Sequence, residues 1–333
     1  MGCGIICWLP NPAKASMDES VSWLPSPSAE ELRPAIGRLV PELAQRPLVF
    51  TDRVVTGDPR FFQGSAVVDG AYIVKFAWSE PPARRIVHEG RALGALGAVG
   101  GLPVPSVVAA AADPSLLITG LVPGQPLSWD DANNISGRRR ERLVRDLAGF
   151  LAALHAPTTL DAVRRAGVGL AMPEPQASTA EIRARFGRYI ESSQRSLVDQ
   201  WCDWVDVILA GPADAVFLHG DLHGYNLVWD PPSGGLRLVA DFETAGAGDR
   251  AFDFRYLPGQ ADTVDLFLEV VRRYESLTNE KLDLERVMAW HIRTVLGDAL
   301  WRTDAGVALP GSGGTASSWV DELETRMRAV VDR

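Results

Sequence analysis

The chain has 333 residues, 46% of them hydrophobic and 23% charged, so it can form one large domain or two lobes with a sizeable core. Its formal net charge of -9 argues against a general surface for nucleic acid or for an anionic membrane. An acidic surface suits a cationic substrate, although solubility alone explains such a charge at least as well.

The three cysteines, Cys3, Cys7 and Cys202, are too few and too unevenly placed for a disulfide framework, which fits a reducing cytoplasm. No apolar run reaches the ~18 residues that a membrane span needs. The apolar segment 4–9 is short and lacks the preceding positive charge of a signal peptide. We therefore expect a cytoplasmic protein without a membrane segment, in which residues 1–16 are an upstream extension or a disordered tail.

The first third of the chain predicts a helix, three strands, a second helix and two more strands. Residues 1–28 are expected to be irregular, because residues 10–28 are rich in Pro and Ser. The pair Asp69-Gly70 is typical of a two-residue hairpin, and Pro81-Pro82 should end the sheet. Helices are predicted over residues 29–45 and 83–96 and strands over residues 48–55, 65–68, 71–77, 106–111 and 116–119.

The rest of the chain is mainly helical in its pattern, with short strands between the helices. The order of elements indicates an α+β fold with a small sheet lobe at residues 29–119 and a larger helical lobe at residues 120–333. Clefts between lobes are favoured ligand sites. The predicted helices cover residues 140–155, 179–210, 262–274, 283–301 and 317–331, and the predicted strands cover residues 216–218, 227–229 and 236–240.

The most informative stretch begins at His219. An apolar strand leads into the sequence His-Gly-Asp-Leu-His-Gly-Tyr-Asn, which ends at Asn226. Fifteen residues after Asn226, a second apolar strand leads into Asp241-Phe242-Glu243. Buried strands that end in carboxylates place those carboxylates at the mouth of a cleft, so we expect a polar site there.

These residue types suit phosphoryl transfer, which depends mainly on positioning and charge neutralisation. Asp221 can serve as the carboxylate near an acceptor hydroxyl. Asn226 and Asp241 can supply the oxygen ligands that a hard ion such as Mg²⁺ prefers. Lys75, on the third predicted strand, can neutralise nucleotide phosphates, and Glu89 on the following helix can pair with it.

The stretch from His219 to Asn226, followed by Asp241-Phe242-Glu243 and by Gly248-Asp249, resembles the aminoglycoside phosphotransferase family, which includes choline-kinase-like and other small-molecule kinases. The earlier part of the chain also matches this family in the order of its elements: Lys75, Glu89, the strand before Gly120 and the helix end at residues 154–155. The resemblance spans roughly residues 48–260 and implies a bilobal protein-kinase-like fold.

The resemblance also implies roles for single residues. Asp221 would be the catalytic base or would orient the hydroxyl, and Asn226 and Asp241 would hold Mg²⁺. Lys75, fixed by Glu89, would contact the α- and β-phosphates.

Further contacts are predicted around the nucleotide. Residues 118–122, among them Thr119 and Leu121, would form the hinge that binds the base of ATP or GTP through its backbone. Gly64 and Ser65, at the end of the loop 57–64, are the candidates for a backbone contact to the phosphates. Glu243 would add a metal contact, as in relatives with an Asp-x-Glu pattern.

Other interpretations fit the same residues less well. The absence of Ala-Pro-Glu after Asp241 argues against a protein kinase. A metal-hydrolase site built on His219 and His223 would need more histidines, and only three others remain, at positions 88, 155 and 291. His219 is interpreted as a structural brace, His223 either as a brace or as a phosphate or substrate contact, and Asp249 and Asp253 as architectural.

Three functions stay open at this point: a phosphotransferase acting on an aminoglycoside or another hydroxyl-rich antibiotic, a kinase of a small metabolite, and a nucleotide-binding module without turnover. The presence of Asp221, Asn226, Asp241 and Lys75 speaks against the third. The expected partner is a small hydroxylated molecule, with neither nucleic acid nor membrane. Asp298 and Asp304, near Trp301, either face a cationic acceptor or form a helix-end cluster.

Overall fold

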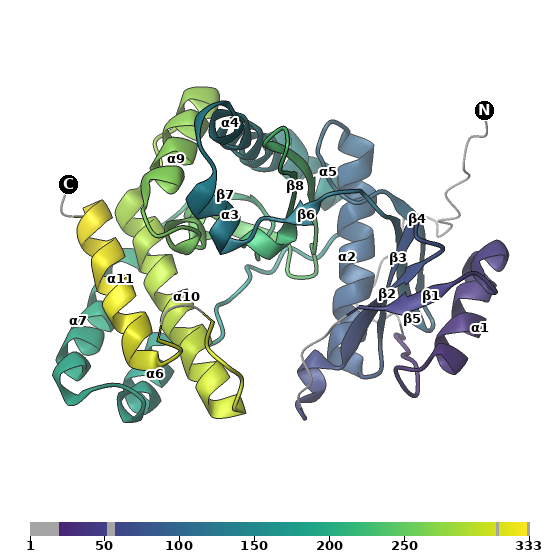
Figure 1. The fold of residues 1–333 in the computed structure, drawn as a ribbon, viewed down its shortest axis with the longest axis horizontal. Coiled ribbons are helices and arrows are strands. Elements are labelled where there is room, and N and C mark those ends of the chain that lie inside the picture. The colour runs from purple at the N-terminus through teal and green to yellow at the C-terminus, as the bar shows by residue number, and fades with distance from the viewer. Residues whose placement is uncertain (1–19, 52–56, 311–312, 332–333) are drawn as a thin grey trace. The chain divides into compact units, whose positions relative to one another are not determined.

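The computed structural model describes residues 20–51, 57–310 and 313–331. The predictions on Cys3, Cys7 and residues 1–16, and the second half of the first predicted strand, lie outside these residues. The chain divides into two compact units (Figure 1). Unit 1 extends to Gln125 and takes in Pro157–Leu170 and Arg237–Ala245, two segments that the expected linear division places in the helical lobe. Unit 2 contains the other residues.

Unit 1 contains a five-stranded antiparallel sheet in the order β1-β2-β3-β5-β4 (Figure 1). Asp69 and Gly70 connect β2 to β3 with φ values of 54° and 64°, as a tight two-residue hairpin turn requires, so the predicted hairpin is present. The strands are β1 (Leu48–Phe50), β2 (Gln63–Val68), β3 (Tyr72–Ala77), β4 (Val107–Ala112) and β5 (Ser115–Gly120).

Two helices of unit 1, α1 (Ala29–Leu39) and α2 (Glu80–Val99), pack on opposite faces of this sheet. Successive side chains of a strand point to opposite faces. Val74 and Phe76 of β3 pack in the core that contains the buried leucine and isoleucine of α1. Lys75, between them, therefore points to the α2 face. A third helix, α5 (Pro157–Arg165), packs against α2.

In unit 1, both predicted helices have boundaries that differ from the predicted ones. α1 ends at Leu39, and a 3₁₀ turn at Pro41–Leu43 replaces the last predicted turns. α2 begins at Glu80 rather than at residue 83, because the first turn of a helix tolerates proline, whose missing N–H has no partner there anyway. Pro81 and Pro82 therefore lie in the first turn of α2, shortly after β3 has ended at Ala77.

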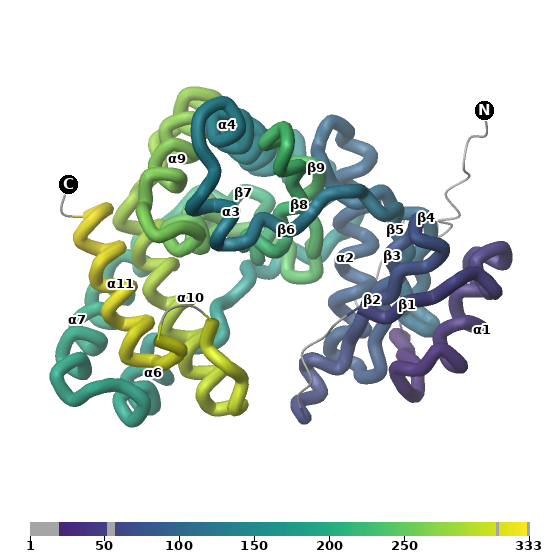
Figure 2. Tube along the Cα trace, in the orientation of Figure 1, coloured from purple at the N-terminus to yellow at the C-terminus, as the bar shows by residue number. Residues whose placement is uncertain are grey.

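Unit 2 is mainly helical. Helices α6 (Thr179–Arg185), α7 (Ser192–Leu209), α10 (Leu284–Ala305) and α11 (Ala316–Val331) share one core, and Figure 2 shows α10 and α11 side by side. Trp201 lies in this core and Trp204 packs against it, as expected. The predicted helix 179–210 is interrupted by a 3₁₀ turn at Phe186–Arg188. The remaining helices are α3 (Trp129–Asn134), α4 (Gly137–Leu154), α8 (Ala251–Phe254) and α9 (Asp265–Thr278), of which α4 and α9 pack together.

Two strands of unit 2 position the segment that begins at His219. β7 (Ala215–Leu218) pairs antiparallel with β10 (Gly246–Asp249), with Leu218 opposite Gly246. The sequence Gly-Ala-Gly-Asp of β10 reads as a loop, so this strand was not predicted. The other short strands are β6 (Gln125–Pro126), β8 (Leu227–Asp230) and β9 (Gly235–Val239).

The expected α+β class is confirmed, with an antiparallel sheet in the N-terminal part and helices dominating the C-terminal part. Within residues 20–51, 57–310 and 313–331, no helix is both long and apolar enough to cross a membrane.

Candidate active site

Lys75 is the centre of a cluster of charges in unit 1. Its Nζ donates to both carboxylate oxygens of Glu89, at 2.8 and 2.7 Å, and to Oδ1 of Asp241 at 2.7 Å. The Lys75–Glu89 pair expected from the sequence is therefore present. The sequence did not indicate that Asp241 would share the same ammonium group.

The negative charges in this cluster keep the Lys75 ammonium protonated. Burial disfavours the ammonium of Lys75, but the attraction of Asp241 and Glu89 outweighs it and raises the pKa of Lys75 above its ordinary value. Burial raises the pKa of Glu89, and the Lys75 ammonium opposes that rise. Lys75 is thus a fixed positive charge at neutral pH.

Glu89 also positions the chain around Asp241. The backbone N–H of Phe242 donates to Oε1 of Glu89 at 3.1 Å, and the Phe242 side chain is fully buried. Asp241 itself has a φ of 70°, in the left-handed region that few residues other than glycine adopt. Such backbone strain persists where surrounding contacts enforce it, and it clusters at functional sites.

Glu243 makes a hydrogen bond to Gln63 and an ion pair with Arg85, two residues that the sequence analysis did not single out. Its Oε2 accepts a hydrogen bond from Gln63 at 2.9 Å, and its Oε1 lies 3.2 Å from Nε of Arg85. Burial raises the pKa of Glu243, with Asp241 adding to the rise and Arg85 opposing it. Neither Gln63 nor Arg85 stands in a recognisable motif, so no sequence signal pointed to them.

Gly64 and Ser65, the predicted phosphate contacts, lie in β2 opposite Phe76 and Lys75, so the expected loop 57–64 ends earlier than predicted. A Cβ atom at Gly64 would lie 3.1 Å from the Phe76 ring, which explains why a small residue stands there. The hydroxyl of Ser65 lies 2.7 Å from that of Thr51.

The predicted hinge residues lie at the end of β5. Thr119 is paired within the sheet, opposite Ile73 and Val107. The N–H of Leu121 donates to the carbonyl of Ala71 at 2.8 Å. A nucleotide base would therefore have to use a different backbone group of this segment, because the Leu121 N–H is engaged.

The segment that carries Asp221 belongs to unit 2 and is held by its backbone. The N–H groups of His219 and Gly220 donate to the two oxygens of Asp253, at 2.8 and 2.9 Å, and the N–H of Asp221 donates to Nδ1 of His219 at 3.1 Å. Arg255 donates to the carbonyl of Gly220 at 2.7 Å. His219 and Asp253 thus have the structural roles expected of them.

A second set of contacts acts on the carboxylate of Asp221. Nε2 of His223 lies 3.5 Å from Oδ2, and the Arg255 guanidinium lies 3.8 Å from Oδ1. Burial alone would raise the pKa of Asp221, but the hydrogen bond from His223 and the charges of His223 and Arg255 hold it well below its usual value. Asp221 is therefore ionised at every physiological pH.

Asn226 is oriented by the same segment. Its Nδ2 donates to the backbone carbonyl of Asp221 at 2.8 Å, which leaves the amide oxygen as the group available to a ligand. Gly224 precedes it at a close approach, where a Cβ atom would lie 2.4 Å from the carbonyl of Leu127. Only glycine fits there, so the path of the chain into Asn226 is fixed.

Further buried polar contacts hold Asp253 and Asp249, the two acidic residues that we interpret as architectural. His155 contacts the Tyr274 hydroxyl through Nδ1 at 3.0 Å and Asp253 through Nε2 at 3.2 Å. Asp249 accepts from the indole N–H of Trp290 at 2.7 Å and from the N–H of Ala251 at 3.0 Å, at the start of α8. The architectural interpretation of Asp249 agrees with these contacts.

The two acidic residues near Trp301 differ in their surroundings. Asp304 is bonded to Arg185, Arg188 and Tyr189, so it belongs to a cluster at the end of the helix. Asp298 pairs with Arg302 at 2.9 Å, and burial raises its pKa, with the charge of Asp221 adding to the rise.

The donor types suit Mg²⁺, which takes oxygen ligands and is commonly held by one or two carboxylates together with substrate phosphates. Oδ1 of Asp241 is bonded to Lys75, and its other oxygen can serve a metal. The described part of the chain contains no group of three or more His, Cys, Asp or Glu residues that could hold a metal without help from a substrate.

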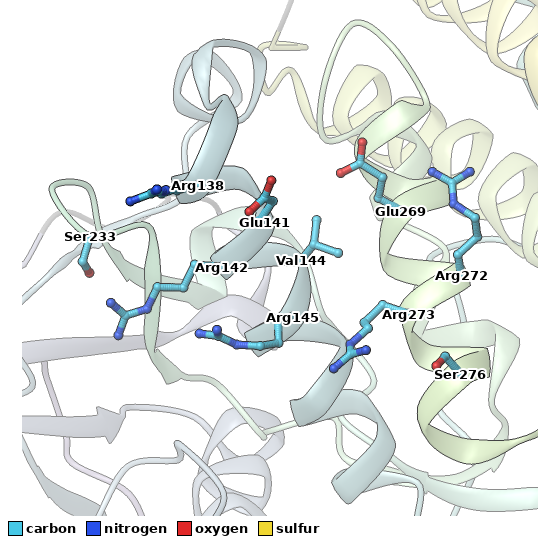
Figure 3. Close-up of a pocket in the computed structure, with 10 residues that line it drawn as sticks. All are labelled: Arg138, Glu141, Arg142, Val144, Arg145, Ser233, Glu269, Arg272, Arg273 and Ser276. Atoms are coloured by element: carbon cyan, nitrogen blue, oxygen red, sulfur yellow. The ribbon is translucent and has the colours of Figure 1, made fainter.

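An open hollow of about 810 Å³ lies between α4 and α9 in unit 2 (Figure 3). It contains none of the predicted site residues. Its charged lining consists of Arg138, Glu141, Arg142 and Arg145 from α4 and Glu269, Arg272 and Arg273 from α9.

The antiparallel sheet lobe with its Lys–Glu pair, and the Asp and Asn that follow β7, define a kinase-like enzyme that transfers phosphoryl groups. The sequence model of the phosphotransferase enzyme family matches residues 58–290, and the chain belongs to this family. The predicted family, fold and enzyme class are confirmed. No curated protein sequence matches the chain.

Solved structures share the fold at low identity. Aminoglycoside 2'-phosphotransferase-IIIa in its wild-type GDP complex is 17% identical, with a TM-score of 0.65 over 90% of this chain and 97% of that chain. Macrolide 2'-phosphotransferase MphH from Brachybacterium faecium, an apoenzyme, is 19% identical, with a TM-score of 0.57 over 91% and 97%. Another macrolide 2'-phosphotransferase, of type I, is 16% identical, with a TM-score of 0.61 over 92% and 98%.

Proposed function

We propose that this phosphotransferase moves the γ-phosphoryl group of ATP or GTP to a hydroxyl group of an antibiotic, an aminoglycoside or another hydroxyl-rich compound. The observation that carries the proposal is the setting of Asp221, an ionised carboxylate on a segment fixed by Asp253 and Arg255. Similar folds occur in aminoglycoside phosphotransferases whose structures hold GDP, ATP or ADP, and in a macrolide phosphotransferase solved as an apoenzyme. These support both the nucleotide and the class of acceptor.

In this proposal Asp221 accepts a hydrogen bond from the acceptor hydroxyl and orients its oxygen toward the γ-phosphorus. The low pKa makes Asp221 a weak base, so its main contribution is to orient the acceptor hydroxyl. The hydroxyl proton is transferred late in the reaction. This suits a loose transition state, in which the bond to the leaving group is largely broken before the hydroxyl oxygen bonds. When the P–O bond forms, the hydroxyl proton passes to Asp221 and then to solvent.

Lys75 is assigned to the nucleotide phosphates, and Glu89 holds it in place. Asn226 and Asp241 are assigned to Mg²⁺, which supplies charge neutralisation on the phosphates when bound. The assignment of both residues to one metal ion rests on the family pattern, because they belong to different units. We assign Asp298 of α10 to an amino group on the acceptor, because its side chain is 32% exposed and a carboxylate can bind a cationic group.

The test is release of ADP or GDP by the purified protein with Mg²⁺, across aminoglycosides, macrolides, other hydroxylated antibiotics and small amino alcohols. Asp221→Asn should lose at least ~10² in turnover while nucleotide binding is retained. Asp214→Asn changes an exposed carboxylate just before β7 and is the matched control. Stimulation by amino alcohols alone would move the assignment to a metabolite kinase. Binding of nucleotide without turnover on any acceptor would contradict the proposal.

A further inference from the structure

Three contacts tie α2 to the chain segment that carries Asp241. Glu89 accepts from the N–H of Phe242 at 3.1 Å, and Nε2 of His88 lies 2.7 Å from the carbonyl of Ala245. Arg85 is the third, through its ion pair with Glu243 at 3.2 Å. Residues three and four positions apart lie on one face of a helix, so one face of α2 holds the segment 241–245 along its length.

Arg85 differs from the other two because it also reaches Arg60, which precedes β2, and Gln63, the first residue of β2. Its Nη2 donates to the carbonyl of Arg60 at 2.7 Å and to Oε1 of Gln63 at 3.2 Å. The amide of Gln63 in turn donates to Glu243 at 2.9 Å. Arg85, Gln63 and Glu243 therefore form a closed ring of polar contacts, called here the Arg85 clamp.

The clamp occupies both oxygens of Glu243, one with Arg85 and one with Gln63. It also lies mostly away from solvent, since the side chains of Arg85 and Glu243 are 26% and 16% exposed. The planar guanidinium suits this task, because its fixed fork can serve a carboxylate and a backbone carbonyl at once, whereas an ammonium is a single point charge.

We propose that Arg85 is a positioning residue that fixes the stretch 59–63, next to the predicted phosphate contacts Gly64 and Ser65, to the segment of Asp241. Glu243 serves this clamp and is not a metal ligand. The inference rests on the proposed function, because it gives the two connected segments their roles in nucleotide and metal binding. Arg85 acts through them and does not touch the reacting atoms.

The first experiment needs neither nucleotide nor metal. Thermal unfolding is measured for Arg85→Gln, Glu243→Gln and the double variant. Each single change should lower Tm by roughly 5 °C, because it leaves a buried charge without its partner, and the double variant should fall no further than the worse single one. Arg84→Gln is the matched control, because Arg84 is the neighbouring residue and pairs on the helix surface with Glu80. Additive losses would overturn the clamp.

The second experiment separates positioning from a purely structural role. Arg85→Gln should raise the KM for the nucleotide by about tenfold and leave the KM for the acceptor unchanged, a loss that corresponds to one charge-assisted contact. Arg85→Lys should recover part of it, since lysine keeps the charge but not the fork. Nucleotide kinetics equal to those of Arg84→Gln would overturn the positioning role.

Titration with Mg²⁺ decides the role of Glu243. The clamp predicts that Arg85→Gln and Glu243→Gln need the same Mg²⁺ concentration for half-maximal rate. A higher requirement in Glu243→Gln alone would make Glu243 a metal ligand and refute the inference. If the wild-type protein turns over no nucleotide, the proposed function fails, whereas the unfolding measurements still decide whether the clamp exists.

Discussion

The replacement of Lys75 by methionine is the sharpest test of the unit 1 cluster, because it keeps an unbranched side chain of similar size and removes the ammonium group with its charge and its N–H donors. Glu89, 1% exposed, would lose the ammonium that contacts both its oxygens at 2.8 and 2.7 Å. Removing one partner of a buried ion pair costs about 3–5 kcal/mol. At about 2 °C for each kcal/mol in a chain of this size, Tm should fall by roughly 6–10 °C.

The loss of stability in Lys75→Met should depend on pH. In the wild-type protein the pKa of Lys75 is raised, so its contribution to stability is complete below its unfolded pKa of roughly 10.5 and is lost only above it. In Lys75→Met the unpaired Glu89 carboxyl has a raised pKa. Stability should then fall as pH rises through that pKa, and the deficit against wild type should shrink toward pH 5.

The assay is thermal unfolding between pH 5 and 9 together with the affinity for a fluorescent nucleotide. Adding Glu89→Gln to Lys75→Met removes the stranded charge, so it should recover most of the lost Tm without recovering nucleotide affinity. This separates the two roles of Lys75. A Lys75→Met protein with wild-type Tm at pH 8 and wild-type nucleotide affinity would show that Lys75 neither stabilises Glu89 nor binds the nucleotide.

Three further predictions concern unit 2. The depressed pKa of Asp221 puts its protonation far below neutral, so kcat should show no acid limb from this residue between pH 5 and 8, and a limb that Asp221→Glu displaces would contradict this. Asp253→Asn should lower Tm by several degrees and reduce kcat at unchanged nucleotide affinity. The reason is that one amide oxygen cannot accept from His219, Gly220 and His155 together. A normal kcat would exclude this positioning role of Asp253. Asp298→Asn should raise the KM about tenfold for acceptors that carry an amino group and leave neutral acceptors unchanged, and equal effects on both would remove Asp298 from the acceptor site.

Local patterns in the sequence were enough to predict most of the helices and strands in their order, together with the candidate site residues, although they missed α3 and α5. Alternating apolar residues and the Asp69-Gly70 turn fix the strands of the sheet, since side-chain period and turn geometry are local properties. The spacing of Asp221, Asn226 and Asp241 was sufficient to predict the family. Lys75 and Glu89 could be paired in advance because strand alternation and the following helix place them on the same side of the sheet.

Other features depend on contacts between segments that are far apart in the sequence. The sequence did not predict β10, because its glycines pair with β7 through backbone groups that carry no side-chain signal. Nor did it indicate that His219, Gly220 and Asp253 form one hydrogen-bonded unit, since contacts across more than 30 residues leave no local pattern. Arg85 shows the same limit. Beside Arg84 it looks like one more surface charge, and only the packing of α2 against the segment 241–245 turns one of these two neighbours inward and leaves the other in solvent.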